Sequence, residues 1–188
     1  MKIRAQIIAF VYPFMMKILK LTGRGRRSLK NGSNVSPFES FYQLKAVLNN
    51  GKEISFEQFK NKKIVIVNLA SECAFTPQYA ALEKVYESHK NLVILGFPSD
   101  DFGKQEPGND EEIVSFCRKK YGVTFPVFQK NIVKGESKQP VYQWLTDKTK
   151  NGWNEQEPKW NFYKYLVDDN GKLSEIFSSA VSPEDIKL

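Results

Sequence analysis

Two apolar runs rich in β-branched residues constrain the fold of this chain more than any other feature. The first covers residues 63–70 (KIVIVNLA) and the second covers residues 92–97 (LVILGF). Runs of this kind are typical of strands that are buried on both faces of a sheet. Residues 78–89 lie between them and carry apolar side chains at helical spacing. A strand, a crossover helix and a second strand predict a right-handed unit with parallel strands.

The rest of the pattern predicts a mixed central β-sheet covered by helices on both faces. A hairpin is expected over residues 41–54, because the Asn and Gly residues at its centre tolerate the positive φ of tight turns. A helix is expected over residues 110–120, with Asn109 as its N-cap. Further short strands are expected at 127–130, 162–168 and 172–177. The fold class is therefore α/β, and we expect the domain to occupy residues 39–188.

The positive charge of the chain is concentrated at its N-terminus. The formal net charge is +7, and residues 1–30 contain eight of the 28 Lys and Arg residues and no acidic residue. The remaining residues carry nearly equal numbers of basic and acidic side chains. A nucleic-acid-binding surface is therefore not expected on the domain.

The N-terminal segment combines these cations with an apolar run. Residues 5–16 are apolar apart from Gln6 and include Pro13, which makes the run shorter than the roughly 20 residues that a spanning helix needs. No small-residue cleavage site precedes the cationic block, so we expect the segment to remain uncleaved. It is predicted to contact or enter a membrane and to leave the domain on the cytoplasmic side. A helix docked on the domain, or a disordered segment, is the alternative, and residues 31–38 are expected to form a linker.

The two cysteines, Cys73 and Cys117, are too few for a disulfide scaffold and lack the spacing of a zinc site. Cys73 follows the first apolar run and precedes the first helix, at the sheet edge where reactive groups gather in α/β proteins. Free backbone N–H groups at a helix N-terminus stabilise a thiolate relative to a thiol. By position alone, Cys73 is equally well interpreted as an unreactive cysteine that packs as a small buried hydrophobic residue.

The neighbours of Cys73 exclude several thiol chemistries. Residues 74–76 (AFT) provide no C-x-x-C pair, and Ala70 stands where the peroxiredoxin pattern needs threonine. The one histidine, His89, is expected at the far end of the helix, so a Cys-His arrangement has no base. The remaining possibility is a thiolate assisted by uncharged hydrogen-bond donors.

Three blocks of the sequence resemble the signature blocks of the glutathione peroxidase family. They are residues 68–73 (NLASEC), 97–108 (FPSDDFGKQEPG) and 159–162 (KWNF), in the order of the family and at compatible spacing. The resemblance covers residues 40–182. It implies a thioredoxin-like fold and a peroxidase that needs neither a cofactor nor a metal.

The resemblance also implies site residues. Cys73 takes the place of the peroxidatic residue, Gln105 that of the catalytic glutamine, and Trp160 and Asn161 those of the Trp-Asn pair. Peroxide cleavage moves charge from sulfur to the departing oxygen. Amide and indole N–H groups can stabilise that charge without titrating.

Cys117 resembles the second cysteine of those family members that use thioredoxin. It lies in the predicted helix 110–120, before a YGVTFP stretch. The resemblance implies that Cys117 attacks a sulfenic acid at Cys73 and forms an intramolecular disulfide, which thioredoxin then reduces. Because a disulfide needs Cα atoms within about 7 Å, we expect the helix to unwind partly during turnover.

The sequence departs from the family pattern in several places. Ala74 replaces a common glycine, and Ser99, Asp100 and Asp101 replace the more usual Cys-Asn-Gln. Two acids at that position are expected to repel anionic substrates, and no arginine cluster favours glutathione. The short connection over residues 130–160 favours a monomer.

These observations predict a cytoplasmic thiol peroxidase, associated with the membrane face, that reduces hydrogen peroxide and organic or lipid hydroperoxides with thioredoxin. The same peroxidase supplied by glutathione is one alternative. A peroxide sensor that passes its disulfide to a partner protein is a second. A membrane-tethered binding module with an inactive site is a third, and the joint presence of Cys73, Gln105, Trp160 and Asn161 argues against it.

Overall fold

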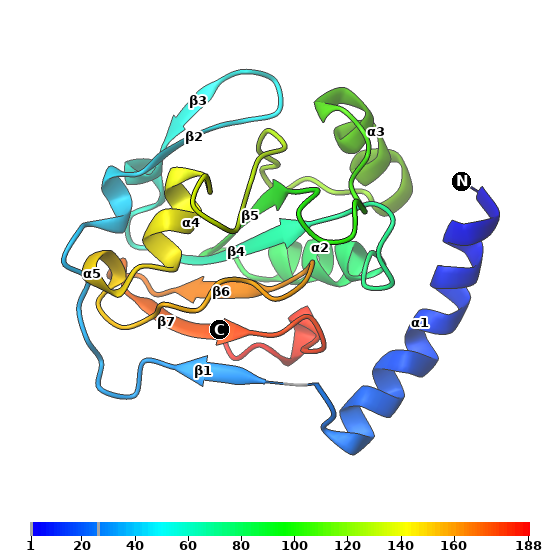
Figure 1. The fold of residues 1–188 in the computed structure, drawn as a ribbon, viewed down its shortest axis with the longest axis horizontal. Coiled ribbons are helices and arrows are strands. Elements are labelled where there is room, and N and C mark those ends of the chain that lie inside the picture. The colour runs from blue at the N-terminus through cyan, green and yellow to red at the C-terminus, as the bar shows by residue number, and fades with distance from the viewer. Residues whose placement is uncertain (1, 26) are drawn as a thin grey trace.

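A five-stranded mixed sheet forms the centre of the protein (Figure 1). The structure, a computed structural model, describes residues 2–25 and 27–188, with side chains described from residue 10 onward. The strand order is β1-β7-β6-β4-β5, where β4 and β5 are parallel and the other neighbours are antiparallel. The bounds are β1 Ser28–Lys30, β4 Lys63–Leu69, β5 Leu92–Pro98, β6 Lys164–Val167 and β7 Leu173–Phe177. The predicted parallel pair and the mixed sheet are confirmed.

Strand β4 is buried on both faces, as its apolar run predicts. Side chains of a strand alternate between the faces, so Val65 and Val67 pack into one hydrophobic cluster while Ile64 and Ile66 pack into the other. All four are at most 2% exposed. Because both faces of β4 are apolar, each is covered by elements that contribute apolar side chains.

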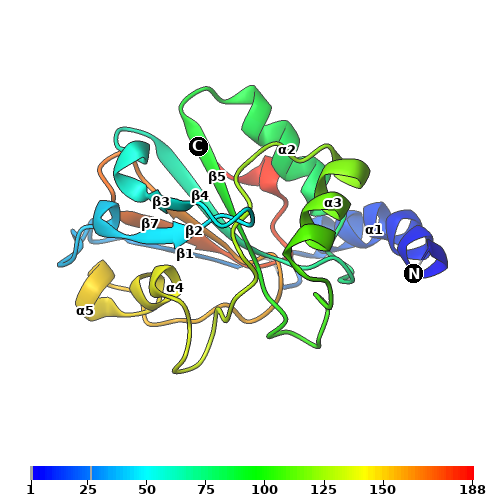
Figure 2. The ribbon, with the colours of Figure 1, turned by 90° about the horizontal axis from the view of Figure 1, so that it is seen from above.

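Helices cover both faces of the sheet (Figure 2). One face packs against α2 (Gln78–Ser88) and α3 (Asp110–Tyr121), and the other packs against α4 (Pro140–Leu145) and two short 3₁₀ helices (Phe41–Gln43 and Phe56–Phe59). The two-faced arrangement predicted from the sequence is therefore confirmed. The short helices α4 and α5 (Lys148–Asn151) are not predicted, because neither is long enough to show helical periodicity.

The predicted hairpin consists of β2 (Lys45–Val47) and β3 (Glu53–Ser55). Gly51 in its turn has a φ of 85°, a conformation that favours glycine. The run expected as a strand at 127–130 forms only isolated bridges, one from Phe128 to the hairpin and one from Val127 to β5. It therefore links the hairpin to the central sheet without becoming a strand.

Helix α3 begins where the sequence predicts. The Asn109 side chain accepts a hydrogen bond from the Glu112 backbone, and the Glu112 carboxylate accepts one from the Asn109 backbone, both at 2.9 Å. This reciprocal cap satisfies backbone donors that a helix start leaves free. Gly122 ends the helix in the left-handed conformation.

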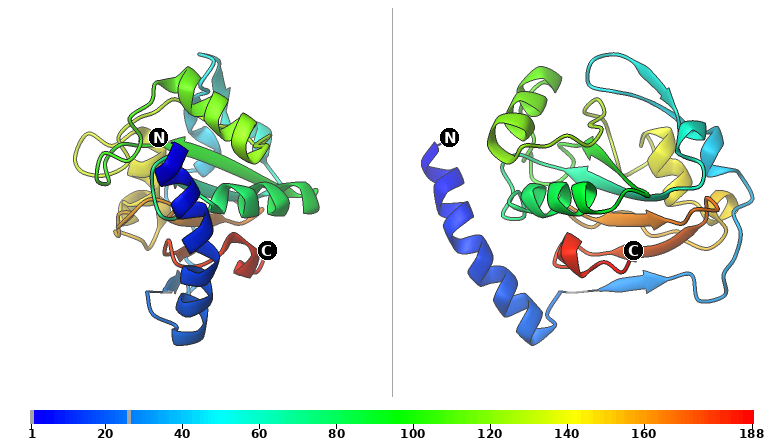
Figure 3. Two further views of the ribbon diagram at one scale, coloured as in Figure 1. Left: turned by 90° about the vertical axis from the view of Figure 1, so that its right-hand side faces the viewer. Right: turned by 180° about the vertical axis from the view of Figure 1, so that it is seen from behind.

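The N-terminal segment contains helix α1 (Lys2–Thr22), which lies at the end of the molecule toward which β4 and β5 point (Figures 1 and 3). Among the residues that the structure describes, no helix has the length and apolar content required to cross a bilayer. After α1, residues 28–30 pair with β7 as an edge strand. The sequence places these residues in the N-terminal segment, whereas the structure includes them in the sheet. An exposed three-residue strand lacks the apolar alternation that would reveal it.

Candidate active site

Cys73 lies in a tight loop between β4 and α2. The backbone N–H of Cys73 donates to the Thr76 hydroxyl oxygen at 3.0 Å, and that hydroxyl donates to the Ala70 carbonyl at 2.9 Å. One threonine thus closes the loop by satisfying two backbone groups. The thiol sits just past the carboxyl end of a central strand, as the sequence predicts.

Uncharged donors converge on the sulfur of Cys73. The Phe75 backbone N–H approaches Sγ at 3.4 Å, and the side chains of Trp160 and Asn161 also hydrogen-bond the sulfur. The Asn161 amide donates to Gln105 Oε1 at 3.0 Å. The structure therefore brings together all four residues that the family resemblance implies, from three segments distant in sequence.

Asn68 positions the Trp-Asn pair. Its side-chain amide donates to the Trp160 carbonyl at 3.1 Å, and its side-chain oxygen accepts from the Tyr163 backbone at 3.0 Å. Its own carbonyl accepts from the Phe162 backbone at 2.8 Å. This role of Asn68 is not among those predicted from the sequence. A sequence signal for it exists, because Asn68 is the one polar residue inside the apolar run of residues 64–70, where a buried side-chain amide needs hydrogen-bond partners.

Gln105 is held by the backbone. Its carbonyl accepts from the Glu72 N–H at 3.0 Å, which ties the Gln105 loop to the residue before Cys73. Gly103 has a φ of 65°, and a Cβ added there would lie 3.5 Å from Gln105 Nε2. A side chain at residue 103 would therefore be strained and would touch the side-chain amide of Gln105.

Burial opposes ionisation of the Cys73 thiol. Cys73 is 0% exposed, and this burial raises the pKa of the thiol, while the hydrogen bonds from Phe75, Trp160 and Asn161 lower it. The sequence predicts an accessible sulfur that is already ionised. The structure shows instead a buried thiol whose pKa is raised by that burial, surrounded by groups that stabilise the thiolate once it forms. Trp160 beside the sulfur is 39% exposed, and Gln105 is half-buried, so the donor side chains around the buried thiol reach the protein surface.

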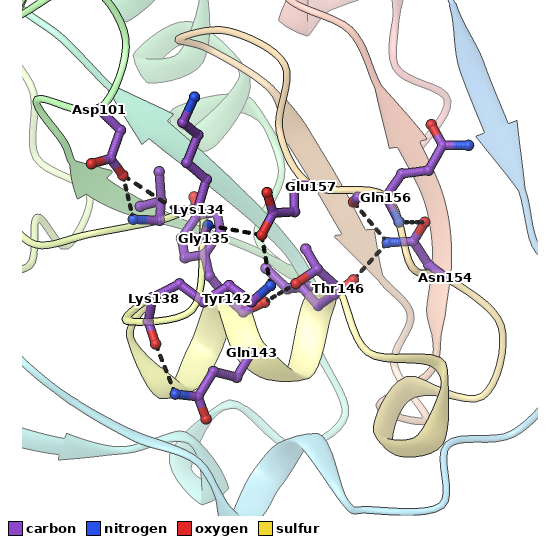
Figure 4. A network of polar contacts seen from close by, with 12 residues as sticks. Asp101, Lys134, Gly135, Lys138, Tyr142, Gln143, Thr146, Asn154, Gln156 and Glu157 are labelled. Atoms are coloured by element: carbon purple, nitrogen blue, oxygen red, sulfur yellow. Dashed lines mark hydrogen bonds and ion pairs between the residues drawn. The ribbon is translucent and has the colours of Figure 1, made fainter.

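Two of the three acids of the 97–108 block, Asp100 and Asp101, organise loops, and the contacts of Asp101 are drawn in Figure 4. Asp101 Oδ2 accepts from the backbone of Val133 at 2.7 Å and of Lys134 at 3.3 Å. Asp100 Oδ1 accepts from the Glu106 backbone at 3.0 Å. Both carboxylates accept hydrogen bonds from backbone N–H groups. Because these bonds partly offset their negative charge, the predicted repulsion of anionic substrates is weakened.

Cys117 is a buried, free thiol within α3, and Cys73 is likewise free. Burial raises the pKa of Cys117 to about 12, and the nearby Tyr79 hydroxyl of α2 opposes that rise. The thiol is therefore neutral in this conformation, and it needs a proton acceptor before it can act as a nucleophile.

The fold and the site together define a thioredoxin-like oxidoreductase that works through a cysteine thiol. A buried thiol at the carboxyl end of a parallel strand, surrounded by amide and indole donors, suits chemistry in which charge leaves sulfur for an oxygen atom. The three residues after Cys73 contain no cysteine, so the site lacks the C-x-x-C pair of dithiol exchange proteins.

Comparisons with known proteins agree with this class. Residues 41–146 match the glutathione peroxidase family. Glutathione peroxidase-like peroxiredoxin 2 of Saccharomyces cerevisiae is 46% identical over 149 residues, which cover 78% of this chain and 92% of the yeast protein. The apo crystal structure of Trgpx is 36% identical, with a TM-score of 0.63 over 79% of this chain and 91% of that one. A thioredoxin family protein of Chlorobium tepidum, 17% identical, has a TM-score of 0.55 over 81% of this chain and 91% of its own and shares the fold.

The chain therefore belongs to the glutathione peroxidase family and is a peroxidase. The family and the thioredoxin-like fold predicted from the sequence are confirmed.

Proposed function

We propose that the protein reduces hydrogen peroxide and organic or lipid hydroperoxides with Cys73 as the nucleophile. The observation that carries this proposal is the convergence of Trp160, Asn161 and the Phe75 N–H on the Cys73 sulfur. The thiolate attacks one peroxide oxygen, the O–O bond breaks, and the departing oxygen leaves as alkoxide or hydroxide that then takes a proton. Cys73 becomes a sulfenic acid.

In the second step, Cys117 attacks that sulfenic acid. The Cys117 sulfur forms a bond to the Cys73 sulfur, the S–O bond breaks, and water leaves. Cys117 lies in the third turn of a capped helix, inside the same hydrophobic cluster as Cys73. Because helical backbone restricts the approach of its sulfur, α3 partly unwinds before the disulfide forms.

Thioredoxin is the proposed reductant of this disulfide. A steady-state assay tests it, with peroxide consumption measured against thioredoxin and against glutathione at matched concentrations. We expect turnover with thioredoxin to exceed turnover with glutathione at least tenfold, since the enzyme accumulates an internal disulfide that a dithiol reduces efficiently. Faster turnover with glutathione would favour the alternative in which glutathione reacts directly with the sulfenic acid.

Helix α1 provides a surface for an anionic membrane. Tyr12, Met15, Met16 and Leu19 are half-buried along one face, and the helix contacts the domain where Tyr12 meets Gln78 and Lys20 pairs with Asp185 at 2.8 Å. Its outer face exposes an apolar stripe that consists of Phe10, Phe14, Ile18 and Leu21. Lys17, one residue before Ile18, is exposed, and the exposed cations Arg24 and Arg27 follow the end of the helix. An apolar stripe beside cations matches the chemistry of a helix in an anionic lipid interface.

The same helix lies close to the active site. Tyr12 interacts with Gln78, the first residue of α2, which follows the Cys73 loop. A membrane bound by the outer face of α1 would therefore face the end of the molecule that carries the thiol. This placement supports lipid hydroperoxides as substrates at the cytoplasmic face of a membrane. The short connection over residues 130–160 supports a protein that acts as a monomer.

Vesicle flotation tests the membrane surface. In the full chain, a Phe10→Ser/Phe14→Ser double variant is expected to lower partitioning onto phosphatidylserine-rich vesicles at least about tenfold, because two aromatic side chains no longer enter the lipid. Phe38→Ser is the matched control, since Phe38 is 75% exposed outside α1. Equal flotation of wild type and double variant would remove the proposal. Truncation is a poorer test, because loss of residues 1–30 also removes β1 from the sheet.

A further inference from the structure

Glu106 is a buried carboxyl that the proposed reaction has not yet used. It follows Gln105 directly, and its side chain is 0% exposed. Neither carboxyl oxygen has a hydrogen-bond partner of normal geometry in the described part of the chain. A buried carboxyl that lacks such partners is unfavourable in the charged form, so its presence beside a reactive site indicates a chemical role.

The loops beside the active site provide part of the surroundings of this carboxyl. Ser71, two residues before Cys73, faces it with its hydroxyl and its backbone N–H. The Lys130 ammonium donates to the backbone carbonyl of Glu106 at 3.3 Å, so its positive charge lies near the carboxyl without pairing with it. Asp100 adds a negative charge from the other side.

Helices α2 and α3 provide the other groups around the Glu106 carboxyl. Tyr79 of α2 and Cys117 of α3 both interact electrostatically with Glu106. Tyr79 is also fully buried, its hydroxyl has no nitrogen or oxygen partner among the described residues, and it interacts with the Cys117 thiol. Glu106 is therefore a buried carboxyl that interacts electrostatically with Cys117 and with Ser71 of the Cys73 loop.

Burial raises the pKa of Glu106 to about 7, a rise that Ser71 and Lys130 partly oppose. A carboxyl with this pKa exists in both protonation states near neutral pH, and it can accept a proton and return it. The Cys117 thiol must lose a proton in the second step, and the hydroxide that leaves the Cys73 sulfenic acid must gain one.

We propose that Glu106 carries this proton: its carboxylate takes the proton of the Cys117 thiol and delivers it to the hydroxide that leaves Cys73. The Cys117 sulfur is oxidised as it forms the S–S bond, the Cys73 sulfur is reduced as its S–O bond breaks, and the proton completes the water molecule. The carboxylate is regenerated, so no further reactant is required. This inference rests on the proposed two-cysteine function.

Glu106→Gln in the full chain tests the inference. Stopped-flow mixing with hydrogen peroxide separates loss of peroxide, which reports sulfenic acid formation, from loss of the Cys117 thiol, which reports disulfide formation. In the wild type, disulfide formation is expected to accelerate as the pH rises through about 7, because the anionic carboxylate is the acceptor. In Glu106→Gln we expect disulfide formation to slow roughly 100-fold and to lose this pH dependence, with sulfenic acid formation within about twofold of wild type.

Controls separate proton transfer from structural damage. Glu111→Gln removes an exposed carboxyl from α3, the helix that carries Cys117, and is expected to keep both rates. An unchanged disulfide rate and pH profile in Glu106→Gln would overturn the inference. If Glu106→Gln does not fold, Glu106→Asp is measured in its place. Because its carboxyl is set back by one methylene, disulfide formation should slow and the pH midpoint of that rate should move; an unchanged rate and midpoint would overturn the inference. If the wild type forms no sulfenic acid at Cys73, the proposed function itself fails.

Discussion

Cys73→Ser is expected to lower peroxide-dependent turnover by roughly 10⁴-fold or more, the largest effect of any single substitution in this protein. A serine hydroxyl fits the space of the thiol and can keep the hydrogen bonds of the loop. Its oxygen does not ionise near neutral pH and cannot form a sulfenic acid. The measurement is peroxide-dependent oxidation of thioredoxin by wild type and variant under the same conditions.

The control for this substitution is Ala74→Gly, which changes the neighbouring residue to the one common in the family and leaves the sulfur in place. It is expected to retain turnover, and both variants should unfold within a few degrees of the wild type. Turnover of Cys73→Ser within tenfold of wild type would show that another group attacks the peroxide.

Cys117→Ser is expected to have the second largest effect, but on a different step. Thioredoxin-linked turnover should fall at least about 100-fold, because no internal disulfide can form. The first oxidation should continue, so that each protein molecule consumes one peroxide and then holds a sulfenic acid at Cys73. Labelling with a sulfenic-acid reagent, followed by mass determination, measures that product.

The same variant distinguishes a peroxidase from a peroxide sensor. A sensor would turn over slowly as wild type, and Cys117→Ser would accumulate a mixed disulfide with one dominant partner protein. A peroxidase would show rapid wild-type turnover with thioredoxin and no such partner. Unchanged thioredoxin-linked turnover in Cys117→Ser would contradict the proposed role of Cys117 and the unwinding of α3.

The position of Cys73 shows how far local sequence signals reach. The apolar run that forms β4, the spacing that forms α2 and the Asn109 cap of α3 are all local patterns, and each predicted its element. They place Cys73 at the carboxyl end of a strand. They do not show that Gln105, Trp160 and Asn161 meet there, which the family resemblance implied and the packing of three distant segments produces.

Strand and helix periodicity lies in neighbouring residues, so the amino-acid sequence alone was enough to predict the α/β fold class and the two-faced sheet. The burial of Cys73 with a raised thiol pKa, the hydrogen bonds by which Asn68 holds the Trp-Asn pair, and the burial of the Glu106 carboxyl appear only in the tertiary structure. Burial and hydrogen bonding at these positions depend on residues that are remote in the chain. No local pattern can therefore specify the electrostatic environment that sets their chemistry.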